Sequence, residues 1–568
     1  MSVCAGLRLT SPWSNVIAAL LGIQTVCLAV QAAGMAGTAS RPALTLLWAL
    51  VTVVGIGAAF MALRRWRPVW RLQSPSLVLL LAITVIAVVA GLLVAVAPST
   101  KGDEVYYHML VPARIVTDGA LHFYRAPWVA AIWPQLAYEI SSTPLHAIGY
   151  PDAPNVASFA LSGLLLIFAW RVVRARGCPP YLAALLTGAM SVGLYPIVWY
   201  GNGGAHAMGD LAMAAAIVSL AQREGLVLKF GPARFAAMTS ILLVSAATSK
   251  ISLLPICLFL LGLNAWPLLR SEHWPQRARL LLAFLLPWLV FYLPILAWTW
   301  IQSGSPFGPM LAGNFGPSIY PADRIAADLR YARDNFQPGF FDFLFATAIG
   351  YSPIVWLGVL GAVLATQLPG NIRASLASVF IVQGGLIYFL LPHEARFLSG
   401  IHFGLLIVFV AHAGDHLRAI FARPQTAVLL SAVFLLPWLA AQLYYARQFF
   451  PVALGLEGKS FYQRNVAYFD DYVALDKLLP ADAVLLAPEG HTSAVYAPRP
   501  IFFNGLDVPA GARPVLFYAA PDKSFANLVA FPYKPGGLIY SNSRAAAVVY
   551  RSGRAPTRAH LEVRKLQK

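Results

Sequence analysis

The segment SLVLLLAITVIAVVAGLLVAVAP at residues 76–98 contains no charged residue and is long enough to cross a lipid bilayer. A membrane-spanning helix needs about 20 such residues, because its side chains face hydrocarbon. The residues that follow, STKGDEVYYHMLVPARIVTDG at 99–119, place Asp103, Glu104 and His108 at the mouth of this segment. What these side chains do depends on the side of the membrane they face and on the other groups that emerge there.

The same apolar composition extends over most of the chain. Of its 568 residues, 59% are hydrophobic and 11% are charged, and the mean hydropathy is +0.66. A soluble protein of this size could not keep so much apolar surface from water, so we predict an all-α polytopic membrane protein. We expect about thirteen transmembrane helices, at 15–37, 42–62, 76–97, 154–173, 181–201, 208–222, 235–249, 251–269, 280–301, 342–366, 375–391, 401–414 and 426–446.

Lys and Arg alternate between the loops as the positive-inside rule requires. With a cytoplasmic N-terminus, the cytoplasmic loops and their margins carry sixteen of these residues, and the longer opposite loops carry nine. The segments 235–249 and 251–269 could also form one long helix, but this would invert every later loop, so the charges favour two. The net charge of +18 then reflects topology and attraction to anionic lipids, and it implies no nucleic-acid partner.

Three segments outside the bilayer are large, and all fall on the non-cytoplasmic side of this map: about 98–153, about 302–341 and 447–568. The last has short apolar runs separated by Pro, Gly and Asn, after a helix-like stretch at 468–479. These features are typical of a small α/β domain. We therefore predict a transmembrane domain at 1–446 and a soluble C-terminal domain at 447–568.

Five charged residues that are far apart in the sequence fall at the outer ends of predicted spans: Asp103, Glu104, Asp210, Lys250 and Arg396. Ionisable groups near a span are costly in lipid and usually face protein or a water-filled cavity. Each has a plainer alternative. The first two acids could be a solvated helix end, the third a snorkelling side chain, the lysine a turn residue, and the arginine half of a surface pair with its neighbour glutamate.

Acids beside cations suit a reaction in which an acceptor is deprotonated and an anionic leaving group is stabilised. Lys and Arg match a phosphate leaving group well. The outer side of a bacterial membrane has no nucleotide pool. An activated donor would therefore arrive dissolved in the membrane, with its head group at the interface.

Several motifs around these residues resemble the GT-C superfamily of membrane glycosyltransferases, which includes protein O-mannosyltransferases and lipid A aminoarabinose transferases. The resemblance covers roughly 75–450, in the family's order. It departs from the family at Ser305, where Asn is usual, in lacking a Pro after the Arg-aromatic pair, and in having no evident Lys-Pro-Pro loop. The motifs are GDEVYYHMLVPARIVTDG (102–119), IWPQLAYEI (132–140), GDLAMAAAIVSLA (209–221), ATSKISLLP (247–255), SGSPFGPML (303–311) and HEARFLSGIHFGLL (393–406).

The resemblance implies a polyprenyl-phosphate sugar as donor and a role for each candidate residue. Asp103 is expected to be the base that takes the acceptor proton, kept ionised by nearby cations. Glu104 and Asp210 would orient the donor or, together with Asp103, a divalent ion such as Mg²⁺, Mn²⁺ or Ca²⁺, a question left open because relatives differ. Lys250 and Arg396 would hold the lipid phosphate. Tyr107, His108 and Glu139 are further candidates for the sugar pocket.

We therefore expect an inverting glycosyltransferase of the bacterial cytoplasmic membrane that acts on the periplasmic side. Its acceptor would be a glycan, lipid or protein of the cell envelope. One alternative is a lipid or polysaccharide transporter, whose key charges would lie near the bilayer midplane in repeated halves. Another is a polysaccharide polymerase or ligase, whose site would centre on Arg and His in a late outer loop. A third is a non-catalytic scaffold, whose charges would scatter over both faces.

Overall fold

The structure is a computed structural model, and it describes residues 12–65, 75–100, 103–126, 128–320, 339, 350–364, 368–390, 395–414, 416–417, 424–459, 463, 466–487, 493–518, 534–548 and 557–567. Half of the second predicted loop, residues 321–338 and 340–341, lies outside the described residues, as does Glu394.

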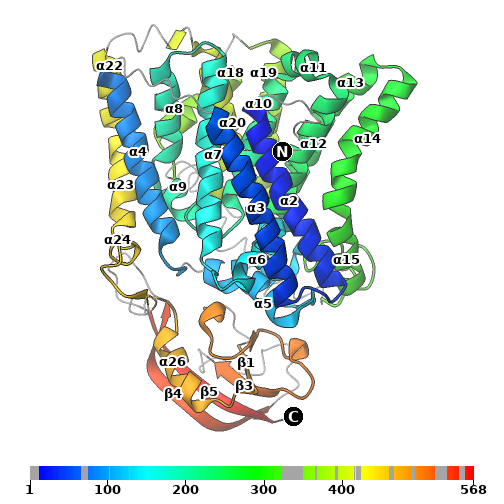
Figure 1. The fold of residues 1–568 in the computed structure, drawn as a ribbon, viewed down its shortest axis with the longest axis vertical. Helices are drawn as coiled ribbons and strands as arrows, with labels where there is room; N and C mark the ends of the chain where they lie inside the picture. Colours follow the sequence, from blue (N-terminus) through cyan, green and yellow to red (C-terminus); the bar gives the residue numbers. More distant parts are fainter. Residues whose placement is uncertain are drawn as a thin grey trace.

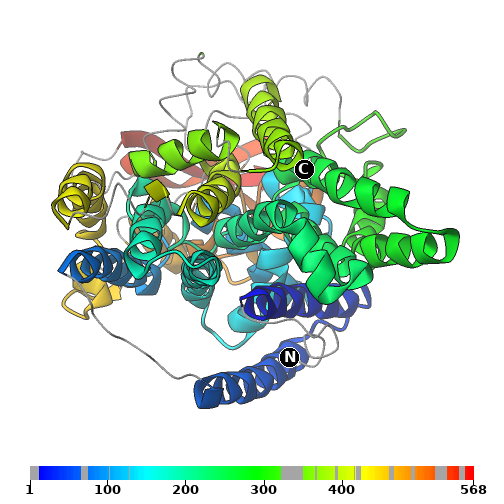
Figure 2. The same cartoon turned by 90° about the horizontal axis from the view of Figure 1, so that it is seen from above.

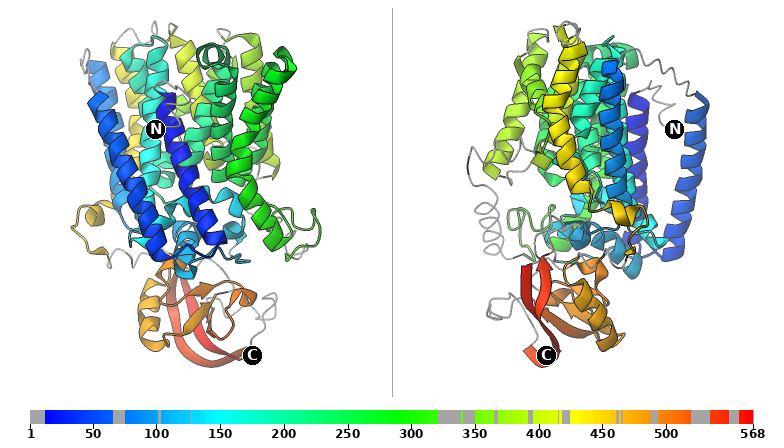
Figure 3. Two further views of the ribbon diagram at one scale, coloured as in Figure 1. Left: turned by 45° about the vertical axis from the view of Figure 1, so that its right-hand side comes forward. Right: turned by 90° about the vertical axis from the view of Figure 1, so that its left-hand side faces the viewer.

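The N-terminal part is a bundle of helices, and a smaller domain with a β-sheet lies at one end of it (Figure 1). The domain stays at this end in both rotated views of Figure 3. Seen from above in Figure 2, the blue N-terminal helices, the green helices α14 and α15 and the yellow helices α22 and α23 lie at different edges of the bundle. The long helices are α2 (Trp13–Met35), α3 (Arg41–Arg65), α4 (Pro75–Val96), α7 (Ala153–Ala175), α10 (His206–Ala221), α12 (Pro232–Ser249), α13 (Leu254–Ser271), α14 (Trp274–Phe291), α19 (Gly370–Leu390) and α20 (Ser399–His412).

Shorter helices complete the bundle and its connections. They are α8 (Pro180–Ser191), α9 (Leu194–Trp199), α11 (Arg223–Phe230), α15 (Leu293–Ser303), α18 (Pro353–Leu364), α22 (Pro424–Phe434), α23 (Leu436–Ala446) and α24 (Phe450–Ala453). The first outer loop contains η1 (Glu104–His108), α5 (Leu110–Asp118), η2 (Trp128–Ala131), η3 (Trp133–Gln135) and α6 (Ala137–Ala147). The short turns η4 (Ile251–Leu253) and η5 (Ala395–Phe397) precede α13 and α20.

Every segment predicted to span the membrane contains helix in the described residues, but a count of thirteen spans is not confirmed. Among the described residues, five helices are long and apolar enough to cross a bilayer, or up to seven if each of two bent pairs is one span. Several predicted spans are broken. The bend between α14 and α15 is 46°, and the segment 181–201 divides at Gly193, where φ is +124°. The apolar helices and the fold described below make the chain a multi-pass membrane protein.

The predicted division at Lys250 is present in the structure. α12 ends at Ser249, and the backbone of Lys250 is extended, with φ −156° and ψ 127°. The chain then starts a new helix with η4 and α13. The 235–269 region is therefore two helices, as the loop charges favour.

In the described residues, the C-terminal domain contains the helix α26 (Phe469–Leu478) and a five-stranded mixed sheet with the order β2-β1-β3-β5-β4. β1 pairs in parallel with both β2 and β3, and β5 pairs antiparallel with β3 and β4. Two short turns, η6 and η7, lie on the connections. The bounds are β1 (Ala483–Leu486), η6 (Ala494–Tyr496), β2 (Ile501–Phe502), η7 (Gly505–Asp507), β3 (Arg513–Tyr518), β4 (Lys534–Val548) and β5 (Thr557–Gln567).

This domain packs directly against the first outer loop. Leu110 of α5 is part of the same buried apolar cluster as Leu485 and Phe517 of the sheet. Arg114 of α5 donates to the carbonyl of Ile501, 3.0 Å away, and stacks on the ring of Tyr124. Because these contacts are buried and mix apolar with polar groups, they hold the domain in a defined position over the loop that carries Asp103 and Glu104.

The contact also contains a carboxylate that is poorly solvated. Asp507 Oδ2 accepts the backbone N–H of Arg125 at 2.9 Å, yet burial raises the pKa of Asp507 to about 6. The folded state therefore holds this proton more tightly than the unfolded chain. Stability from this group is present at acidic pH and is lost as the pH rises through about 6.

We expect Asp507→Asn to raise the melting temperature at pH 7 by a few degrees, on the scale of about 1 kcal/mol of stability. The gain should disappear as the pH falls toward 4, where the wild-type carboxyl is protonated. Thermal unfolding of both proteins in detergent across this pH range measures the difference. Asp482→Asn, in an exposed pair with Arg513, is the matched control. A variant that is less stable at pH 7 would contradict the prediction.

Candidate active site

The five charged residues singled out in the sequence lie close together in the fold. Arg396 contacts Asp103 and Lys250, and Ser399, three residues later, binds Asp210. The C-terminal domain packs on the loop that carries Asp103 and Glu104. Asp103 and Glu104 follow α4, and Asp210 lies in the first turns of α10. Lys250 separates α12 from η4, and Arg396 lies in η5 just before α20. Because α4 and α12 end where α10 and α20 begin, the bundle topology gathers these groups from four separate stretches of chain.

Asp103, Lys250 and Arg396 form one cluster. Arg396 Nη1 lies 2.9 Å from Asp103 Oδ2, with the two side chains 19% and 39% exposed. Lys250 Nζ donates to the backbone carbonyl of Arg396 at 3.4 Å and lies 4.9 Å from the ring centre of Phe397. The cluster is partly open to solvent, so a substrate group can reach it. An opposite charge at this distance favours the ionised form of a carboxylate.

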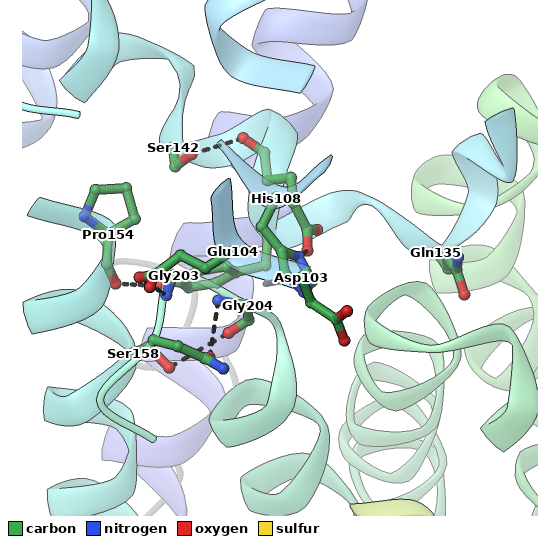
Figure 4. Close-up of polar contacts among 12 residues, drawn as sticks. Asp103, Glu104, His108, Gln135, Ser142, Pro154, Ser158, Gly203 and Gly204 are labelled. Carbon is green, nitrogen blue, oxygen red and sulfur yellow. Dashed lines mark hydrogen bonds and ion pairs between the residues drawn. The ribbon is translucent and has the colours of Figure 1, made fainter. Parts of the chain in front are cut away.

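Glu104 faces the other way. It is almost completely buried, and its Oε1 accepts hydrogen bonds from Ser99 Oγ at 3.0 Å and from the backbone N–H of Gly203 at 3.1 Å. Figure 4 shows this contact on one side of the backbone and the Asp103 carboxylate on the other. The two adjacent acids are therefore in different environments: Asp103 faces the cations, and Glu104 ties the first outer loop to the loop before α10. A donor-orienting role for Glu104 stays a prediction.

His108 and Glu139 form a buried pair behind this motif, with His108 Nδ1 2.5 Å from Glu139 Oε1. The Tyr107 ring lies against His108, with ring centres 4.0 Å apart. Residues 104–108 form a turn of π-helix, a wider turn that often marks functional sites. Gly204 is required beside it, because a Cβ there would lie 2.9 Å from His108 Nε2. The three sugar-pocket candidates are thus neighbours, and their role in sugar binding stays a prediction.

Asp210 lies within the bundle, 5% exposed, in a network of hydroxyl groups. Its Oδ2 accepts from Tyr195 at 2.7 Å and from Tyr200 at 2.8 Å, and its Oδ1 accepts from Ser399 Oγ at 2.5 Å. Both carboxylate oxygens are therefore occupied by protein donors. Direct contact between Asp210 and a donor stays a prediction.

Sequence reasoning did not identify Trp199, Ser399 or the hydroxyl groups around Asp210. The Arg396 guanidinium lies 4.6 Å from the ring centre of Trp199 and 5.3 Å from that of Phe397. Stacking of this kind holds the planar cation in one orientation. Phe397 follows Arg396 in the Arg-aromatic motif, but no local spacing points to Trp199, because its contact depends on tertiary structure.

The loop after α15, with Ser305 in place of the expected Asn, packs on the first outer loop. Ser305 Oγ donates to the carbonyl of Met310 at 3.0 Å. Gly308 has φ +61°, and a Cβ there would lie 2.4 Å from the carbonyl oxygen of Ala131. The loop therefore needs a glycine at this point, where it packs against Ala131 of η2.

A divalent ion would need several carboxylate or imidazole groups that converge. Within the described part of the chain, no group of three or more His, Cys, Asp or Glu side chains is arranged to hold one. Asp103, Glu104 and Asp210 have different direct partners, which are Arg396, Gly203 and Tyr200 respectively. As they are arranged, these three carboxylates do not converge on one metal ion.

The bundle, its large first outer loop and the C-terminal domain define a membrane protein with the GT-C fold. Two solved structures that it resembles are of ArnT, a lipid A aminoarabinose transferase, from Cupriavidus metallidurans. The apo structure has a TM-score of 0.50 and 14% identity, and the structure bound to undecaprenyl phosphate has 0.48 and 12%. Each alignment covers 86% of this chain and 97% of ArnT. No protein-family model and no curated protein sequence matches the chain.

The likeness to the apo ArnT structure confirms the expected fold, and it shows the fold alone. Identity this low carries no information on substrate or on individual residues, so the activity is argued below from the site.

Proposed function

We propose that the chain is an inverting glycosyltransferase of the bacterial cytoplasmic membrane that transfers a sugar from a polyprenyl-phosphate donor to a cell-envelope acceptor. The observation that carries the proposal is the partly exposed cluster of Asp103, Arg396 and Lys250 at one end of a membrane bundle. A carboxylate next to two cations, at the level where a lipid head group would lie, provides both a base and a phosphate site. The ArnT-like fold is consistent with this chemistry.

In the proposed reaction, Asp103 takes the proton of the acceptor hydroxyl as its oxygen forms a bond to the anomeric carbon. The bond from this carbon to the phosphate oxygen breaks, and the polyprenyl phosphate leaves with the electron pair. Arg396 and Lys250 stabilise the charge that develops on the phosphate. The guanidinium offers several N–H donors, so a donor phosphate that binds it competes with Asp103 and leaves the carboxylate free to accept a proton.

The lipid donor follows from position. A phosphate bound beside Arg396 would lie where the helices meet the C-terminal domain, so its hydrocarbon chain can remain in the bilayer. The acceptor is a glycan, lipid or protein of the envelope. A transporter or flippase is less well supported, because the described charges of the site gather at one end of the bundle rather than near its middle.

The direct test is an assay of the purified protein in nanodiscs with radiolabelled polyprenyl-phosphate sugars and envelope acceptors. Transfer of label to an acceptor, with release of polyprenyl phosphate, is the expected result. Movement of intact donor lipid between leaflets without release of the phosphate would favour the transporter alternative. Polymerised product with no consumption of monophosphate donor would favour a polymerase.

The orientation of the chain in the membrane gives a separate prediction. The proposal requires the end of the bundle that contacts the C-terminal domain to face the periplasm. A reporter that is active only outside the cytoplasm should be active when fused after Lys568 and silent when inserted near Arg277, at the start of α14. The positive charges of the predicted cytoplasmic loops are the physical reason. An active fusion at Arg277, or a silent one after Lys568, would place the cluster in the cytoplasm and remove the argument for a lipid donor.

A further inference from the structure

Asp210 is a buried carboxylate of the bundle, and its surroundings do not suit direct contact with a substrate. It is buried with Tyr195, Tyr200 and Ser399, which are all at most 4% exposed. Its two oxygens accept three hydroxyl hydrogen bonds of 2.5–2.8 Å. A buried carboxylate is stable only when its charge is met in this way. A residue that belongs to this network and is also joined to the cation cluster can therefore hold that part of the site in place.

Ser399 connects this network to the cation cluster. It is the first residue of α20 and comes three positions after Arg396. Besides donating to Asp210, its Oγ lies 3.5 Å from the carbonyl oxygen of Arg396, the same carbonyl that accepts Lys250 Nζ. The single hydroxyl proton of Ser399 goes to Asp210, so the link to η5 is the short backbone between Ser399 and Arg396. Holding Ser399 in place therefore restrains η5, which carries the guanidinium and the acceptor for the lysine.

The helices that carry the two ends of this link are packed without room for adjustment. A Cβ on Gly400 would lie 2.9 Å from Asp210 Cα, and one on Gly404 would lie 3.1 Å from Ala214 Cα. Glycines four residues apart let helices in membranes approach to backbone contact. If the Asp210–Ser399 contact changes, α20 therefore cannot slide along α10 to compensate. We expect η5, the turn before α20, to move instead.

We propose that Asp210 is a positioning residue: through Ser399 it holds η5 so that Arg396 and Lys250 converge on one phosphate group. This deepens the function proposed above and rests on it for the identity of the phosphate. It assigns Asp210 an action through Ser399 and Arg396, in place of contact with the donor or a metal.

The test is a double-mutant cycle read by the binding of sugar-free undecaprenyl phosphate to the full protein in nanodiscs. Ser399→Ala removes the link and leaves Asp210 its two tyrosine donors. We expect binding to weaken about tenfold, the usual effect of one hydrogen bond to a charged group. In the Arg396→Ala background, Ser399→Ala should have a clearly smaller effect, because only the alignment of Lys250 on the backbone carbonyl of residue 396 remains to be lost.

Matched variants separate positioning from general stability. Ser399→Thr keeps the hydroxyl and should restore most of the binding. Ser219→Ala removes a buried hydroxyl of α10 that bonds only its own helix, to Ala216, and should leave binding unchanged. In turnover, Ser399→Ala should raise the KM for the donor and leave the KM for the acceptor unaltered.

The possible outcomes are distinct. If Arg396→Ala weakens binding and Ser399→Ala does not, the inference is overturned and the proposed function stands. Additive effects of the two changes also overturn it. If the wild type binds no polyprenyl phosphate, the proposed function fails, and a cryo-EM structure of Ser399→Ala then decides the inference. A displaced η5 with the Asp103–Arg396 contact broken supports it, and an unmoved turn overturns it.

Discussion

Asp103→Asn should lower turnover by about 10² to 10⁴, the usual worth of general base catalysis. The amide has nearly the size of the carboxylate and can still accept a hydrogen bond from Arg396, but it cannot take the acceptor proton. Donor binding should persist, because Lys250 and Arg396 remain in place. The folded state should lose about 1 kcal/mol or less, since the pair with Arg396 is partly exposed. Single-turnover kinetics in nanodiscs would measure the loss.

Glu104→Gln is the informative companion, because Glu104 is adjacent in sequence but points to Gly203. The amide oxygen can replace the carboxylate oxygen that accepts from Ser99 and Gly203, so we expect a smaller loss of turnover with some loss of thermal stability. Near-normal turnover in Asp103→Asn with an inactive Glu104→Gln would assign the base to Glu104. Near-normal turnover in both would remove the glycosyltransferase proposal from this stretch.

The sequence predicts the larger features of the molecule well, because hydropathy and charge act over long stretches. Helices occur wherever spans are expected, and the break at Lys250 follows from the charges of the loops on either side. The number of crossings is less accessible. Apolar segments break at Gly193 and between α14 and α15, where Pro294 lies in the first turn of α15, and hydropathy averages over such breaks.

At the site, the sequence is a good guide to which ionisable residues lie together, but a poorer guide to the role of each. Asp103, Lys250 and Arg396 are found together because the outer ends of several helices meet. Asp103 and Glu104 are adjacent in the sequence. Only the fold shows that Asp103 faces the cations and that Glu104 binds the backbone of Gly203. The hydroxyl groups that occupy Asp210 come from α9, α20 and the residue after α9, and no sequence spacing connects them.

Arg396→Ala should lower kcat/KM for the donor by about 10² to 10³, similar to the loss of one preorganised donor to a developing anion. Its guanidinium lies between Asp103 and the rings of Trp199 and Phe397, which orient it. Removing it takes away a phosphate contact and the charge that favours ionised Asp103. The acid side of the pH–rate profile should therefore also move to higher pH. Steady-state rates with varied donor concentration, across pH 5 to 8, measure both effects.

Arg396→Lys separates charge from geometry. Lysine keeps the positive charge but loses the planar fork and most of the stacking on Trp199, so a partial recovery of about tenfold over Arg396→Ala is expected. Arg270→Ala, at the exposed C-terminal end of α13, is the control for loss of a surface cation and should leave the rate unchanged. Full activity in Arg396→Lys would mean that the site needs only a point charge. Full activity in Arg396→Ala would leave Lys250 as the phosphate ligand, and the ion pair with Asp103 would then be a surface contact without a role in transfer.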